Sequence, residues 1–131
     1  MTEREVTERA TVESGDVYDD PSEDALLLLL EDIEDGREAF VIVERLADAS
    51  GQTYAQSTRA DDGRYVVEHR AGAPRRHFHV VVDDVRAAHA LLTAWTFDLP
   101  GWREAGWSPG FAPSGLSPGR ARASRGSAGS S

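Results

Sequence analysis

The most restrictive feature of this 131-residue sequence is the spacing of four strand-like runs between residues 39 and 82. The runs cover residues 39–43, 54–59, 64–70 and 77–82, and the connections between them have 10, 4 and 6 residues. Parallel neighbours need crossover connections of about a dozen residues or more. We therefore expect the four strands to pair in chain order as an antiparallel meander.

A helix is expected before the first of these strands. Asp20 and Pro21 are followed by Ser and Glu, the order of a helix start, with Asp20 as N-cap and Pro21 in the first turn. Gly36 stands where helices commonly end. The apolar residues between these signals recur at helical spacing: Leu26, Leu29, Leu30 and Ile33. Leu27 and Leu28 widen this apolar face, which predicts burial against a broad surface.

A second helix is expected after the last strand. Asp83 or Asp84 supplies its N-cap, and Pro100 marks the point beyond which the helix cannot continue. Its apolar stripe consists of Val85, Ala88, Leu91, Leu92 and Trp95. Two helices on one face of four strands, in the order α-β-β-β-β-α, define a two-layer α+β domain.

Charge divides the chain into three parts. Residues 1–48 hold 16 acids and 4 Arg, residues 49–107 hold 7 of each, and residues 108–131 hold 3 Arg and no acid. We expect residues 1–18 to be an acidic flexible N-terminus and residues 19–107 to be the single folded domain. Gly, Ser, Pro and Arg dominate residues 108–131, which is typical of a disordered tail.

Composition excludes several classes of protein. The chain has no Cys, so it has no disulfide, thiolate nucleophile or Cys-type zinc site. A formal net charge of −9 disfavours direct binding to nucleic acid or to an anionic membrane. The longest apolar run, Leu26–Leu30, is far shorter than the roughly 20 residues of a membrane span, and no secretory signal precedes it. A cytoplasmic location is therefore expected.

Catalytic and cofactor motifs are also missing. The sequence holds no G-x-S-x-G elbow, no Walker A loop and no G-x-G-x-x-G fingerprint, so neither an enzyme activity nor a cofactor is expected. All 14 basic residues are Arg, with no Lys or Asn, which indicates a GC-rich genome such as that of an actinobacterium.

Three histidines form the one candidate metal site. If the strands at 64–70 and 77–82 pair about Ala73, His69 lies opposite His77, and His79 lies on the same face. Three imidazoles on one face could ligate zinc or another divalent metal. A slip of one residue in the register would remove the cluster and leave a polar sheet face instead.

The acidic N-terminal third is the candidate partner-binding region. A block of one charge sign marks either a solvated surface or a surface for a partner of opposite sign. Trp107 either fastens its own segment to the sheet or anchors an interface. The candidate partner-binding residues are Asp16, Asp19, Asp20, Glu31, Asp32, Glu34, Asp35 and Trp107.

A family resemblance covers residues 40–107. It rests on the Tyr-containing strand 54–59, the segment DGRYVVEHR at 62–70, the His-Phe-His strand, a short helix and a Trp-rich close. This pattern resembles actinobacterial immunity proteins of polymorphic toxin systems, of the deaminase-inhibitor type. The resemblance implies a small acidic protein that blocks the active site of a cognate toxin and catalyses nothing.

Two other functions fit the same sequence. One is an acidic chaperone or adaptor for a secreted effector, which would usually dimerise, whereas we expect a monomer. The other is a metal-dependent enzyme that uses His69, His77 and His79. For the immunity function the expected partner is a basic protein, namely the toxin domain, because an acidic surface speeds association with it.

Overall fold

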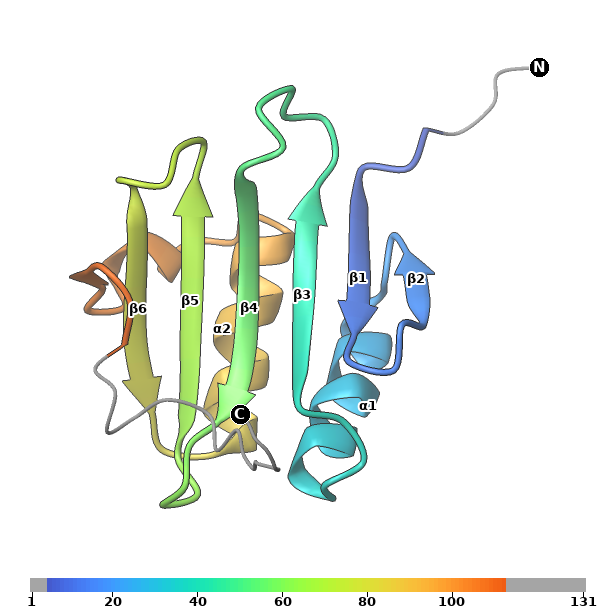
Figure 1. The fold of residues 1–131 in the computed structure, drawn as a ribbon, viewed down its shortest axis with the longest axis vertical. Coiled ribbons are helices and arrows are strands. Elements are labelled where there is room, and N and C mark those ends of the chain that lie inside the picture. The colour runs from blue at the N-terminus through green and yellow to red at the C-terminus, as the bar shows by residue number, and fades with distance from the viewer. Residues whose placement is uncertain (1–4, 113–131) are drawn as a thin grey trace.

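Two helices pack on one face of a seven-stranded antiparallel sheet in the computed structural model, which describes residues 5–112 (Figure 1). The strand order is β2-β1-β3-β4-β5-β6-β7, so β3 to β6 form the meander, and β7 adds to the β6 edge after α2. The elements are β1 (Glu8–Val12), β2 (Val17–Asp19), α1 (Glu23–Glu34), β3 (Phe40–Arg45), β4 (Thr53–Arg59), β5 (Tyr65–Ala71), β6 (His77–Val82), α2 (Val85–Thr96), the 3₁₀ turn η1 (Trp102–Glu104) and β7 (Ser108–Pro109). The α+β class, both helices and the four-stranded meander predicted from sequence are confirmed.

Two strands, β1 and β7, lie outside the domain that the sequence predicts, and β2 overlaps it only at Asp19. β1 lies within the segment expected to be a flexible N-terminus, and β2 lies at the end of that segment. β7 lies in the expected tail. β1 buries only Ala10 and Val12, and all of β2 is exposed, so the apolar alternation is too short to reveal them. β1 joins the sheet because its main chain pairs with β3 along its whole length. Residues 113–131 of the expected tail lie outside the described residues.

The start of α1 differs from the prediction by two residues. Ser22, and not Asp20, is the N-cap: its hydroxyl accepts a hydrogen bond from the Ala25 N–H at 3.1 Å. Asp20 has a φ of 48°, and its carboxylate accepts the N–H groups of Thr7 and Glu8 at 2.9 and 3.0 Å. The Asp20 carboxylate therefore joins the end of the β1–β2 hairpin to the start of β1.

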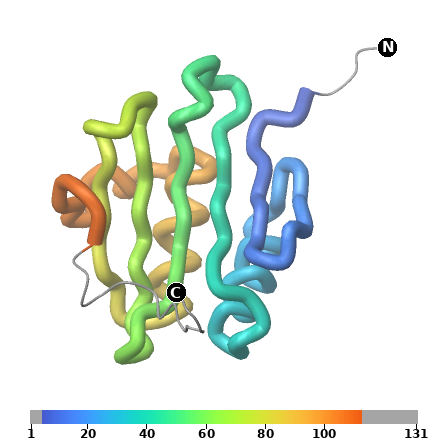
Figure 2. Tube along the Cα trace, in the orientation of Figure 1, coloured from blue at the N-terminus to red at the C-terminus, as the bar shows by residue number. Residues whose placement is uncertain are grey.

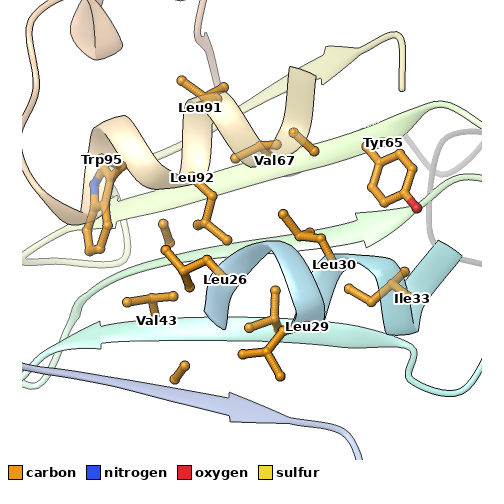
Figure 3. Packing of buried hydrophobic residues seen from close by; sticks show 14 of the residues in the cluster. Leu26, Leu29, Leu30, Ile33, Val43, Tyr65, Val67, Leu91, Leu92 and Trp95 are labelled. Atoms are coloured by element: carbon orange, nitrogen blue, oxygen red, sulfur yellow. The ribbon is translucent and has the colours of Figure 1, made fainter. Parts of the chain in front are cut away.

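The core fills the layer between the sheet and the two helices (Figure 3). α1 packs on β3 and β4, α2 packs on β4 and β5, and the helices contact each other. Asp84 is the N-cap of α2 and accepts the Ala87 N–H at 2.9 Å. The fully covered side chains include Leu26, Leu30, Val41, Val43, Tyr65, Val67 and Leu92. Leu28 is 62% exposed, so the broad apolar face predicted for α1 is narrower than expected.

The two edges of the sheet carry different parts of the chain. The β1–β2 hairpin lies at one edge, and residues 97–112 run along the opposite edge beside β6 (Figure 2). Among residues 5–112 no helix lies on the other face of the sheet, and we call it the helix-free face. Within residues 5–112, no helix has the length and apolar character needed to cross a membrane.

Candidate functional site

The register of β5 and β6 separates the three histidines. The ladder pairs His69 with Phe78 and Arg70 with His77, one residue away from the predicted register. The hairpin closes through the Ala71 N–H and the Arg76 carbonyl at 3.0 Å, so its centre falls between Ala73 and the next residue. His69 therefore lies on the helix-covered face, and the predicted three-histidine cluster is wrong.

His77 and His79 share the helix-free face without His69. Among residues 5–112, no group of three or more His, Cys, Asp or Glu side chains is placed to hold a metal ion. The three-histidine site that the alternative function of a metal-dependent enzyme requires is therefore not formed by these residues.

A buried polar network takes the place of that cluster on the helix-free face. Glu68 is only 6% exposed, and its Oε1 accepts the Gln56 side-chain amide at 2.8 Å and faces His77 Nε2 at 3.3 Å. His77 itself is 2% exposed. The network joins β4, β5 and β6, because each of these strands contributes one of the three residues. Buried polar groups satisfied in this way hold the strands in a single register.

The tautomer of His77 follows from its partners. Arg70 Nε lies 3.2 Å from His77 Nδ1, and a guanidinium only donates hydrogen bonds, so Nδ1 accepts. The ring proton then resides on Nε2, where it is donated to Glu68. Arg70 also donates to the Gln52 side-chain oxygen at 2.8 Å. The carboxylate, imidazole and guanidinium are thus linked in one chain of hydrogen bonds.

His69 is enclosed by aromatic rings on the helix-covered side. Its ring centroid lies 5.0 Å from that of Phe78, 5.2 Å from that of Trp102 and 4.4 Å from that of Trp107. Burial lowers the pKa of His69 to about 4, and the nearby His77 adds to the effect. His69 is consequently a neutral packing residue at pH 7, with Nδ1 buried and without a hydrogen-bond partner among the described residues.

Trp107, the predicted interface anchor, is half-buried in this aromatic cluster. Its indole N–H donates to the Trp102 carbonyl at 2.8 Å, and its ring lies edge-on to His69. These contacts fix its own segment to the edge of the sheet. A role as an interface anchor stays a prediction.

The predicted acidic residues belong to the β1–β2 hairpin, to α1 and to the residues next to them. Residues 5–38 contain all of these, lie at one side of the sheet (Figure 1), and are called the acidic end. Residues 5–38 hold 13 acids and 2 Arg, a net charge of −11, whereas residues 39–112 hold 9 acids and 8 Arg. The α1 helix has no basic residue in its last turn. Carboxylates there face the negative end of the helix dipole, which costs roughly 0.3–1 kcal/mol each when exposed.

Several of the predicted residues have partners inside the chain. Asp19 forms an ion pair with Arg9, and Asp32 and Asp35 both contact Arg37. The two Arg side chains in these ion pairs are the only basic residues among residues 5–38, against 13 acids, so the acidic end stays negative overall.

Two predicted residues differ from the others in what they do for the fold. Glu34 accepts the Tyr65 hydroxyl at 2.6 Å, and Asp20 caps main-chain N–H groups as described above. Asp16 and Glu31 are exposed, and their side chains have no ion pair or hydrogen bond among residues 5–112. These two carboxylates are the ones most available to a partner.

Sequence reasoning missed Gln56, Glu68 and Phe111. Gln56 and Glu68 each follow an apolar residue of a central strand, Ala55 and Val67, and a polar residue at the next position is a weak signal for a polar sheet face. Phe111 lies in a segment whose composition resembles a tail, and that composition outweighs a single aromatic residue as a signal for packing.

No family model matches this chain, and neither the curated proteins nor the solved structures include a significant match to it.

Proposed function

We propose that this protein is an immunity-type inhibitor, which binds a basic toxin domain through the acidic end and blocks its active site. The observation that carries the proposal is the net charge of −11 over residues 5–38, against −1 over residues 39–112. The rest of the fold is nearly neutral, so a basic partner is attracted to the acidic end more strongly than to any other part of residues 5–112.

Electrostatics gives this arrangement a physical use. Toxins that act on nucleic acid are basic around their active sites, since they must hold phosphates. A patch of opposite sign raises the association rate by about 10- to 1000-fold at low ionic strength. Asp16 and Glu31 are exposed carboxylates within this end that are free of ion pairs among the described residues.

The local cost of the acidic end also favours a binding role. Glu31, Asp32 and Asp35 stand in or next to the last turn of α1, where the helix dipole opposes them and Arg37 compensates only in part. A surface under no constraint other than stability would carry basic residues at that position. An acidic chaperone for a secreted effector remains the alternative, and a stable homodimer would favour it.

The experiment requires a gene next to this one that encodes a basic protein, and that protein then serves as the partner. We compare D16N/E31Q/D35N with the matched control D61N/D83N/E104Q, which neutralises three exposed acids elsewhere on the surface. At low salt, the association rate is expected to fall at least about tenfold in the first variant and less than about threefold in the control. Dissociation should change little, because steering acts on encounter.

Two results would overturn the proposal. One is an equal loss of association rate in the two triple variants, which would show that total charge and not the acidic end matters. The other is no binding and no protection of cells that express the neighbouring basic protein.

A further inference from the structure

Residues 108–112, which we call the strap, lie along the free edge of β6 (Figure 1). β7 pairs with β6 in antiparallel register, His79 opposite Ser108. The Gly110 N–H donates to the His77 carbonyl at 2.7 Å, and His79 Nδ1 lies 2.9 Å from the Gly110 carbonyl. The strap thus attaches through its main chain, as a peptide does when it extends the edge of a sheet.

Phe111 supplies the one large side chain of the strap. Its ring stacks on His77, with a centroid distance of 4.1 Å and an interplanar angle of 29°. The Arg70 guanidinium carbon lies 5.9 Å from the Phe111 ring and 5.4 Å from the Tyr54 ring. Phe111 nevertheless stays 65% exposed, so its ring lies on the surface and is not enclosed by the core.

Glu68 holds the end of the strap. Its Oε2 accepts the Ala112 N–H at 3.0 Å, while its Oε1 is occupied by Gln56 and His77. A carboxylate that is 6% exposed needs donors on both oxygens, because an unpaired buried charge is costly. Oε2 would therefore take another peptide N–H, or a cationic side chain, if the strap left.

We propose that the strap occupies a peptide-binding site made of the β6 edge, the His77 ring and Glu68. Its ligand is an extended segment of a partner protein that carries an aromatic residue at the position of Phe111. Three of the contacts are made by main-chain atoms that any peptide offers, and the fourth is a ring stacked on an imidazole. The inference rests on this edge geometry and not on the function proposed above.

The strap acts as a competitor within the same chain. A segment tethered this closely has an effective concentration on the order of millimolar, so a free peptide of the same sequence competes poorly with it. The site becomes available to a partner only if the strap opens without unfolding the sheet. Its exposed ring and two-residue strand fit such a local opening.

The first test measures amide hydrogen exchange in the full chain by NMR. We expect the Gly110 and Ala112 amides to exchange at least about 100-fold faster than the Val67 amide in the middle of β5, through an opening that low urea does not affect. Exchange of all three amides at one common rate, rising with urea, would show that the strap is a permanent part of the fold and would overturn the proposal.

The second test adds the probe peptide acetyl-Ser-Pro-Gly-Phe-Ala-amide to the full chain. In G110P/F111A, proline cannot adopt the φ of 88° or donate to His77, and the ring is lost, so the strap is released. We expect the probe to bind this variant at least about tenfold tighter than the wild type, with shifts at the amides of Glu68 and His79. Phe97→Ala, which removes an exposed ring outside the strap, should behave as the wild type.

A probe with Ala in place of Phe should bind the released variant at least about tenfold more weakly. Equal binding of the two probes, or equal affinity of the wild type and the released variant, would contradict the proposal. If the released variant is unfolded by circular dichroism, the exchange experiment on the wild type decides.

Discussion

Protonation of His69 is expected to destabilise the protein as the pH falls below about 6.5. The ring is enclosed by Phe78, Trp102 and Trp107, and burial lowers its pKa to about 4 from the ordinary value of 6.5. Between these values the unfolded chain binds a proton that the folded chain excludes, so stability is complete above about pH 6.5 and declines towards pH 4. The loss reaches about 2 kcal/mol at about pH 5.

Urea unfolding followed by tryptophan fluorescence, from about pH 7.5 to about pH 4.5, measures this loss. His69→Phe keeps an aromatic ring among the three neighbours and removes the titrating group, so the unfolding free energy of this variant should be nearly flat over this range. The pKa is also lowered at three carboxyl groups, those of Asp48, Asp62 and Asp98. Their effect on stability falls below the pH range of this experiment, because Asp titrates at about pH 4 even in the unfolded chain.

His89→Gln is the matched control, since His89 lies on α2 and contacts the Glu23 carbonyl at 2.9 Å. This control should retain the slope of the wild type. The reasoning would be refuted by a slope in His69→Phe as steep as that of the wild type, or by a wild type whose stability is independent of pH between about 5 and 7.

Three further predictions concern the fold. Leu30→Ala should lower the unfolding free energy by about 2–5 kcal/mol, because Leu30 is fully buried. Leu28→Ala should lower it by less than about 0.5 kcal/mol, because Leu28 is exposed. Similar losses for the two variants in urea melts would contradict the core assignment. Ser22→Ala should cost about 1 kcal/mol by removing the α1 cap, and thermal melts that match the wild type would exclude that role. Burial and the hydrogen bond to Glu34 raise the pKa of Tyr65, so stability should fall as the pH rises above about 10, and less so in Tyr65→Phe; unfolding curves recorded against pH compare the two.

Local sequence signals were sufficient for much of the fold. Short connections required the meander, and the helical spacing in α1 and α2 identified the buried faces. β1 was not predicted, because Ala10 and Val12 are the only residues of this strand that are buried in the core. Its place in the sheet comes from pairing with β3. Along the chain, β2 and α1 lie between these two strands. Single-strand patterns cannot reveal such long-range partners.

Of the candidate sites, only the one formed by residues close together in the sequence could be predicted. The acidic end could be predicted, since its charges are neighbours in the sequence. The network of Gln56, Glu68 and His77 could not, because it depends on the register of three strands, and the register of the last pair depends on the Ala71–Arg76 closure of the hairpin. The strap could not be predicted either, because the chain returns to pair with β6 only after α2. The Pro- and Gly-rich composition of the strap gives no sign of that pairing.

The salt dependence of the association rate with a basic protein encoded by a neighbouring gene tests the central claim most directly. Steering by the acidic end predicts a one-to-one complex whose association rate falls by about tenfold or more between about 20 and about 200 mM salt. That fall should be largely absent in D16N/E31Q/D35N and present in D61N/D83N/E104Q. A rate that does not depend on salt, or depends on it equally in all three proteins, would contradict a binding role for the acidic end.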